Sequence, residues 1–409
     1  MAVLDSTVVN VALPDMARSF GAGVAGMQWV VDGYALLFAS LLLTAGALGD
    51  RLGNRGTFVA GLALLRHHYH DPAERAQAIG IWAAATGVAV AAGPVVGGIL
   101  THAWSWRSVF LVNLPVGVLG GWLTLRHVPP VPPHHAGPLD LKAQALGITA
   151  LGGLTFGLIQ GGVWGWGAAP VVVALAIAAA AGVFFYLGER RATHPMLPPA
   201  LFRDPTFSAA NAVGAILSFG FYGELFLMSL FFQQVQHRSP LAAGLALLPQ
   251  TAVISLMNFV SGQVTARRGA RLPMALGLAT GGVGLLGLAL VGARASLVSV
   301  VGPMLAVGVG ASLAMPAMTH AAIDHTPKER AGIGSAVLNA SRQVGGVVGI
   351  ALLGALISPH APRGIATAHF MTGLHGGLAL AGLLFLAGSG LSLAFVERPT
   401  SRAPRGPSR

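Results

Sequence analysis

Apolar runs of about twenty residues alternate with short polar segments along most of this chain. A helix needs about 20 apolar residues to cross the hydrocarbon core of a bilayer. We therefore predict a membrane-spanning helix for each run of that length: 28–48, 78–100, 108–125, 144–163, 169–188, 207–232, 241–264, 272–292, 295–318, 333–357 and 374–396. Residues 1–13 have the pattern of the second half of one further helix. The predicted fold class is an all-α polytopic membrane protein with about 12 spans.

One apolar run is too short for this pattern. It opens at Thr57 and ends after nine residues at Leu65, where Arg66 and a group of histidines follow. Nine residues are about half of what a spanning helix requires. We expect this segment, 57–65, to stay on one side of the membrane.

Composition agrees with a membrane protein. Hydrophobic residues make up 54% of the 409 residues and charged residues only 9%, with a mean hydropathy of +0.71. About a quarter of a soluble globular chain is charged, so that class is excluded. The absence of cysteine excludes disulfides, thiolate metal sites and cysteine nucleophiles. No cleavable signal is expected, because no basic segment precedes the first apolar stretch.

The net charge of +11 is distributed unevenly between the predicted loops. With residues 49–56 placed in the cytoplasm, cytoplasmic segments hold eighteen of the 24 lysines and arginines, and external segments hold five. The remaining one, Arg342, lies inside a span. Basic residues concentrate on the cytoplasmic side of membrane proteins. We therefore interpret the positive charge as a signal of membrane orientation and not of nucleic-acid binding. We expect both termini in the cytoplasm.

An internal repeat accounts for the short run. "GALGDRLGNRG" at 46–56 resembles "GQVTARRGARL" at 262–272, an offset of 216 residues, and "DPAERA" at 71–76 resembles "TPKERA" at 326–331, an offset of 255. The two offsets differ by 39 residues, which is about two spans. We predict that the first half lacks a helical hairpin and that residues 57–65 mark its place.

These motifs carry a family resemblance. The chain resembles the fourteen-helix drug:proton antiporters of the major facilitator superfamily nearly from end to end. The motifs that carry the resemblance are "LDSTVVNVALP" at 4–14, "GALGDRLGNRG" at 46–56, "GVAVAAGPVVGG" at 87–98, "WSWRSVFLVNLPVG" at 104–117 and "NASRQVGGVVGIALLG" at 339–354. The chain departs from the family pattern by starting inside helix one and by lacking most of helices three and four. The helix-four arginine implicated in proton coupling is lost with them.

The resemblance implies two pseudo-symmetric helical bundles with an extra helix pair between them. The expected divisions are an incomplete N-terminal bundle, a proline-rich cytoplasmic linker, the extra pair, a second linker, the C-terminal bundle and a basic tail. Their ranges are 1–126, 127–143, 144–188, 189–206, 207–397 and 398–409.

Four charged residues fall within predicted spans: Asp5, Asp32, Glu224 and Arg342. Charges inside a bilayer are costly and usually face a cavity, where they act in transport. A carboxyl that carries protons must be able to become neutral, and burial favours the neutral form. The resemblance also places a functional acid at Asp5. The alternative for Asp5 is a solvated acid at a frayed helix end.

Glu224 lies in the middle of an apolar run, with Phe221, Leu225 and Met228 on the same helix face. An acid among such side chains suits a proton site or a pocket for lipophilic cations. The alternative is a structural acid that a neighbouring helix caps.

Arg342 and Asp32 are placed less centrally. Arg342 is the basic residue inside a span, so it is a candidate partner for a membrane acid, with snorkelling to the interface as the alternative. Asp32 lies beside Trp29 and Tyr34, which are typical of an interfacial aromatic belt, so we expect it in an external vestibule.

Two glycine-containing motifs suit moving helices. The first is the loop motif at 46–56, and the second is the antiporter motif at 87–98. In the loop motif the glycines permit close approach of helices and a tight turn, the aspartate can cap a helix, and the arginines bind acids or lipid phosphates. Family members use such contacts to hold one conformation, and plain membrane anchoring is the alternative. The antiporter motif forms a helix that can bend and pack closely at the repeat interface. The residues are Gly46, Asp50, Arg51, Gly53 and Arg55 in the loop motif, and Gly87, Gly93, Pro94, Gly97 and Gly98 in the antiporter motif.

Together these features predict a proton-coupled exporter of small lipophilic or cationic molecules in a bacterial plasma membrane. The expected energy source is the proton motive force, with no cofactor or metal, because no cysteine or acid pair completes a site around the histidines at 67–70 and 134–135. The expected partners are small-molecule substrates, protons and lipids, without nucleic acid, and the chain is expected to be monomeric. No constellation typical of an enzyme falls within the spans. The alternatives are a transport-incompetent remnant of such an exporter and an exporter of one endogenous metabolite.

Overall fold

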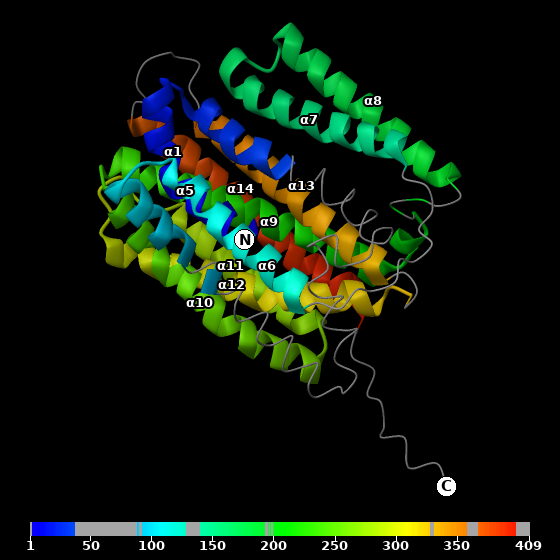
Figure 1. Cartoon of the computed structure of the whole chain (residues 1–409). Coiled ribbons are helices and arrows are strands. Elements are labelled where there is room, and N and C mark those ends of the chain that lie inside the picture. Colours follow the sequence, from blue (N-terminus) through cyan, green and yellow to red (C-terminus); the bar gives the residue numbers. More distant parts are fainter. Residues whose placement is uncertain are drawn as a thin grey trace.

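The computed structural model describes residues 2–36, 88–89, 92–127, 140–192, 195, 197, 199–327, 331–357 and 367–397. Within these ranges the regular structure is helical and contains no strand. Residues 24–36 and 92–103 form two helices that carry no label in Figure 1. The labelled elements are α1 (Ala2–Phe20), α5 (Ser108–Leu111), α6 (Asn113–His127), α7 (Leu141–Trp164), α8 (Ala169–Arg191), η1 (Pro199–Arg203), α9 (Pro205–Leu230), η2 (Phe231–Val235), α10 (Pro240–Arg268), α11 (Arg271–Leu288), α12 (Leu297–Asp324), α13 (Ala331–Ile357) and α14 (Thr367–Phe395).

Eight helices among the described residues are long and apolar enough to cross a membrane. They are α7, α8, α9 with η2, and α10 to α14, and they match the eight predicted spans from 144–163 onward. The predicted spans 28–48 and 78–100 are described only in part. The short run at 57–65 and the whole loop motif, from Gly46 to Arg55, lie outside the described residues, as does Gly87.

Two N-terminal elements differ from the sequence prediction. The first helix was expected to end near Leu13, but α1 continues through Pro14 to Phe20. The predicted span 108–125 is divided at Val112 into α5 and α6. Pro115 explains the division, because it has no amide N–H and its ring clashes with the carbonyl of the residue four positions earlier, which is Leu111.

Local sequence signals set the helix ends elsewhere. Asp140 caps α7 by accepting a hydrogen bond from the amide of Ala143 at 2.9 Å, and Asp204 caps α9 in the same way. Helices α9 and α10 each begin with a proline, whose missing N–H costs nothing in the first turn. Gly269, with φ of +74°, ends α10 in a conformation that glycine adopts without strain.

Glycines allow the C-terminal helices to pack closely. A Cβ atom at Gly277 on α11 would lie 2.6 Å from the carbonyl oxygen of Gly310 on α12. Gly345 and Gly349 on α13 face the backbone of α9 at Ala215 and Phe219. Small residues four positions apart bring membrane helices into van der Waals contact, which stabilises them where lipid offers no hydrophobic driving force.

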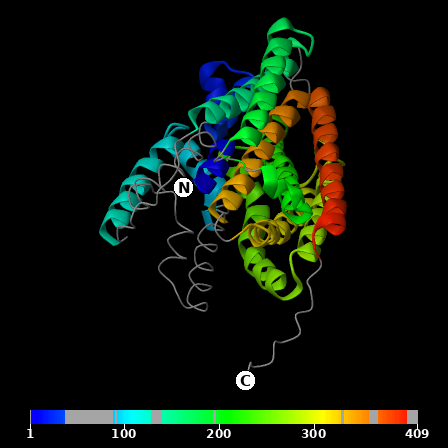
Figure 2. The same ribbon diagram turned by 90° about the vertical axis from the view of Figure 1, so that its right-hand side faces the viewer.

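The extra helix pair and α6 lie at the edge of the molecule. Figure 1 shows α7 and α8 side by side along one flank, and α7 contacts α13. In Figure 2, α6 and α14 lie on opposite sides. Helix α8 exposes Val172, Val173 and Phe184. Apolar surface of this extent is unfavourable in water and suits contact with lipid acyl chains.

Candidate functional site: polar contacts between the two helical bundles

The helices before α7 meet the C-terminal bundle at one end of it. We call this the Gln236 end, where α9 gives way to α10, and we call the opposite end, where α12 finishes, the His325 end. Ser229 donates a hydrogen bond to the carbonyl oxygen of Asn10 at 2.7 Å, and Gln233 donates to that of Val11 at 3.1 Å. Gln233 lies in the π-helical turn η2. These bonds join α1 to α9 and η2.

A second polar contact joins helix 24–36 to α13. The side-chain amide of Gln28 is fully buried and donates to the carbonyl oxygens of Ile350 at 3.0 Å and Ala351 at 2.7 Å. Gly354 leaves the room for this, because a Cβ atom there would collide with the Gln28 side chain. One neutral side chain thus crosses from the first helices to the C-terminal bundle.

The glycines of the antiporter motif form the third contact. A Cβ atom at Gly97 would lie 2.6 Å from the carbonyl oxygen of Val8 on α1, and one at Gly98 would lie 2.8 Å from Cα of Leu241 on α10. Gly244, one turn along α10, meets the backbone carbonyl of Pro94. Helix 92–103 therefore packs closely between α1 and α10. Larger side chains at Gly97, Gly98 or Gly244 would push these helices apart.

Asp32 shares a helix face with Gln28. It is one turn after Gln28, and it is fully buried. Neither carboxylate oxygen has a hydrogen-bond partner among the described residues. Its neighbour Trp29 turns to another face and contacts Phe156 of α7, with ring centroids 6.0 Å apart.

Glu224 is fully buried in the C-terminal bundle. Its Oε2 accepts a hydrogen bond from Nε2 of Gln250 on α10 at 2.8 Å, and its Oε1 has no partner among the described residues. Phe221, Leu225 and Met228, which the sequence placed on the same face, are buried with it. A buried acid with one free oxygen is able to take up and release a proton.

Arg342 does not pair with Glu224. Its Nη2 atom lies 3.7 Å from Sδ of Met315 on α12, and its Nε atom has no partner among the described residues. The stem of the side chain passes α9 at Gly214, where a Cβ atom would lie 3.2 Å from Cγ of Arg342. The arginine therefore points among α9, α12 and α13 without a described carboxylate beside it.

Asp5 lies in α1, five residues before Asn10. The bonds from Ser229 and Gln233 bring its helix against α9, which carries Glu224. Sequence reasoning missed the neutral members of the site, which are Gln28, Gln250, Ser229 and Gln233. An amide in an apolar run is a weak signal, but a buried amide requires a hydrogen-bond partner, and that requirement could have drawn attention to Gln28 and Gln250.

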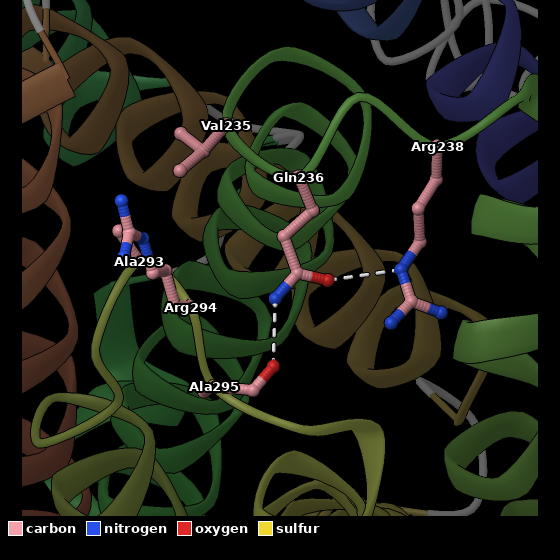
Figure 3. Close-up of a pocket in the computed structure, with 6 residues that line it drawn as sticks. All are labelled: Val235, Gln236, Arg238, Ala293, Arg294 and Ala295. Atoms are coloured by element: carbon pink, nitrogen blue, oxygen red, sulfur yellow. Dashed lines mark hydrogen bonds between the residues drawn. The ribbon is translucent and has the colours of Figure 1, made fainter.

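A cavity of about 330 Å³ opens at the Gln236 end, apart from the buried acids. Figure 3 shows Gln236 between Arg238 and Arg294. The Gln236 amide donates to the carbonyl oxygen of Ala295 at 3.0 Å and accepts from Nε of Arg238 at 2.9 Å. Gln236 thereby ties the connection before α10 to the connection before α12.

At the His325 end, a cluster of polar side chains joins three helices. His325, after α12, lies 3.0 Å from Asp204, before α9, and 3.9 Å from Glu397, after α14. Partial burial raises the pKa of Asp204, but hydrogen bonds from the amide of Phe207 and from His325 outweigh it, so this pKa lies below its ordinary value. These groups hold the ends of α9, α12 and α14 together.

Comparison with known proteins identifies the fold. The sequence model of the Major Facilitator Superfamily matches residues 56–350. The chain belongs to this superfamily. It is accordingly a multi-pass membrane protein of a transporter family whose members carry small molecules.

Curated superfamily relatives include resistance and export proteins. The chain is 34% identical to the multidrug resistance protein Stp of Mycobacterium tuberculosis, covering 89% of this chain and 76% of that one. It is 32% identical to the methylenomycin A resistance protein of Streptomyces coelicolor, covering 98% and 91%. That match has 441 aligned positions, and 98% of 409 residues is about 401, so about 40 positions have no counterpart in this chain. This number is close to the difference of 39 between the repeat offsets.

Solved superfamily structures share the fold at low identity. A bacterial homologue of the human lysosomal transporter Spinster, in an inward-facing and occupied conformation, has a TM-score of 0.53 at 16% identity, covering 95% of this chain and 92% of that one. The human organic anion transporter MFSD10 has a TM-score of 0.57 at 13% identity, covering 95% and 97%.

Proposed function

We propose that this protein exports small lipophilic or cationic compounds across the plasma membrane in exchange for protons. The observation that carries the proposal is the fully buried Glu224, with one carboxylate oxygen bonded to Gln250 and the other free among the described residues. In the carboxylate form the site attracts a cation, and in the neutral form it does not. One group can therefore bind a proton and a cationic substrate in turn.

The names of the relatives support export. One is a multidrug resistance protein, and others confer resistance to methylenomycin A or resistance to and export of tetracenomycin C. For this chain we propose the same direction of transport, with both termini cytoplasmic and the Gln236 end external. Asp5 and Asp32 supply further proton or substrate positions, and the protein acts as a monomer driven by the proton motive force.

The contacts between the bundles support alternating access. Among the described residues, Ser229, Gln233 and Gln28 each donate to backbone carbonyls across the interface at the Gln236 end. Neutral hydrogen bonds of this kind break without leaving a buried ion unpaired. We propose that they close the external side while substrate enters from the cytoplasm, and that the bundles, taken as 1–126 and 207–397, rock about the centre of the membrane.

Transport in liposomes tests this function. Purified protein is reconstituted, a pH gradient with an acidic lumen is imposed, and uptake of tetraphenylphosphonium is followed. We expect uptake that collapses when nigericin dissipates the gradient. The proposal would be contradicted if a monodisperse preparation showed no gradient-dependent uptake of any compound in a panel of lipophilic cations and neutral compounds.

The second candidate is a transport-incompetent remnant. The observation that favours it is the set of about 40 aligned positions without a counterpart in this chain, a length equivalent to about two spans. Inserting the corresponding segment of the methylenomycin A resistance protein between residues 65 and 71 discriminates the two. Transport that appears only after the insertion would establish the remnant, and equal transport without it would exclude the remnant.

A further inference from the structure

Gln250 connects Glu224 to a helix that reaches the other bundle. Both residues are fully buried, and the bond between Nε2 of Gln250 and Oε2 of Glu224 measures 2.8 Å. Gln250 lies on α10, while Glu224 lies on α9. A hydrogen bond to a charged carboxylate is roughly twice as strong as one to a neutral group. The strength of the link between the two helices therefore depends on whether Glu224 holds a proton.

Helix α10 carries this link toward the N-terminal helices. Six residues before Gln250, Gly244 meets the carbonyl of Pro94, and Leu241 packs against Gly98. Six residues of α-helix span about 9 Å. The acid and the contact with helix 92–103 are thus less than two helical turns apart along one element.

A proline separates these two points. Pro249 lies inside α10, directly before Gln250. It has no amide N–H, so the carbonyl of Leu245 loses its helical donor. Kinks in long helices occur at such positions. Helix α10 can therefore bend between the residue that holds Glu224 and the residues that hold helix 92–103.

We propose that Gln250 is a positioning residue that couples the proton on Glu224 to the contact between α10 and helix 92–103. This rests on the proposed function of Glu224. The carboxylate holds the Gln250 amide and keeps α10 in the conformation seen here. When a proton from one side of the membrane binds the carboxylate, the link weakens, α10 changes its bend at Pro249, and the contact at Gly244 loosens. The same proton later leaves Glu224 on the other side, and Gln250 exchanges none.

A distance measurement tests the coupling. The chain has no cysteine, so spin labels are introduced at two exposed positions without removing native thiols: Trp104, after helix 92–103, and Leu256, on α10 beyond Pro249. We expect the distance distribution between the labels to change between pH 5 and pH 9. In Gln250→Leu the change should be lost. The matched control is Thr251→Ala, because Thr251 is equally buried but bonds only to its own helix.

Two further variants make each outcome decisive. Gln250→Asn keeps the amide but shortens its reach, so it should also lose the pH-dependent change, and it replaces Gln250→Leu if that variant does not fold. A change that persists in Gln250→Leu or Gln250→Asn overturns the coupling. Glu224→Gln separates this from the proposed function: a change that persists there removes Glu224 as the proton site, whereas loss in Glu224→Gln with persistence in Gln250→Leu removes only the role of Gln250.

Discussion

The side-chain amide of Gln28 donates to the backbone carbonyl of Ala351 at 2.7 Å, across 323 positions of sequence. With the bond to Ile350, it joins helix 24–36 to α13. A hydrogen bond contributes about 1 kcal/mol net, which is about a fivefold change in an equilibrium. Gln28→Leu removes both bonds, about 2 kcal/mol together, and should therefore shift the population up to about thirtyfold toward states open at the Gln236 end.

Spin labels at Phe20 and Leu290 report this shift, because both are exposed near that end on different bundles. The longer-distance population should increase in Gln28→Leu. Thr149→Val on α7 serves as the control, since its hydroxyl bonds only to Ala145 within the same helix. An unchanged distribution in Gln28→Leu would show that the bond does not hold the bundles together.

Glu224→Gln should abolish proton-driven efflux and leave expression intact. The amide keeps the shape of the side chain but cannot bind and release a proton as a carboxylate does. Drug efflux from cells and the amount of membrane-inserted protein measure the two effects. Glu189→Gln is the matched control. Glu189, near the end of α8, is also a buried acid, but its carboxylate accepts a hydrogen bond from the backbone amide of Leu197. Full efflux by Glu224→Gln would remove the proposed role of Glu224.

Asp5→Asn should also abolish efflux without loss of expression, since α1 is held against α9 by the bonds from Ser229 and Gln233. Asp15→Asn is the control within the same helix, because Asp15 lies near its end and pairs with Arg18. The two variants are compared in the same efflux assay. Equal efflux from both would argue that Asp5 is a solvated acid.

Gly349→Val should lower stability, because the glycine meets the backbone of α9 at Phe219. Added volume in a close-packed interior costs about 1–3 kcal/mol, so the midpoint of thermal unfolding in detergent should fall by several degrees. In Gly390→Ala on α14 nothing lies within 4 Å of the added Cβ. A fall in both variants would point to a general effect of replacing helical glycine and not to the contact with α9.

Stability should depend on pH through Asp204. Its pKa is lower in the folded protein than in the unfolded chain, where it is about 3.9. The contribution is therefore complete above the unfolded value and is lost as pH falls through the folded pKa. Between pH 6 and pH 3 the thermal midpoint should fall less steeply in Asp204→Asn than in the wild type. Parallel curves would contradict this account of the His325 cluster.

Apolar run length predicted the C-terminal spans well, because a bilayer dictates helix length and each of these runs is long enough to cross it. It missed the one-residue interruption at Val112 within 108–125, which Pro115 follows, and the continuation of α1 through Pro14 to Phe20. Run length counts apolar residues and does not include the backbone effect of an individual proline. That effect depends on which carbonyl lies four positions earlier.

The candidate site was only partly predictable. A charged residue in an apolar run is a strong sequence signal, so Glu224 was a candidate from sequence alone, and the structure buries it. Its partner Gln250 and the link from Gln28 to α13 were not, because a neutral amide gives little signal until the opposite helix is known. Likewise, the sequence left Arg342 either as the partner of a membrane acid or as a snorkelling side chain, and in the structure its Nη2 lies near Sδ of Met315. Partners between helices depend on rotation about each helix axis, which hydropathy does not report.

Proton release on substrate binding tests the central claim most directly. Purified protein in weakly buffered detergent solution is mixed with tetraphenylphosphonium, and binding and the change in pH are recorded together for the wild type and for Glu224→Gln. If Glu224 exchanges a proton for substrate, the wild type releases protons on binding and Glu224→Gln releases none. Equal release per bound substrate from both proteins would contradict the account.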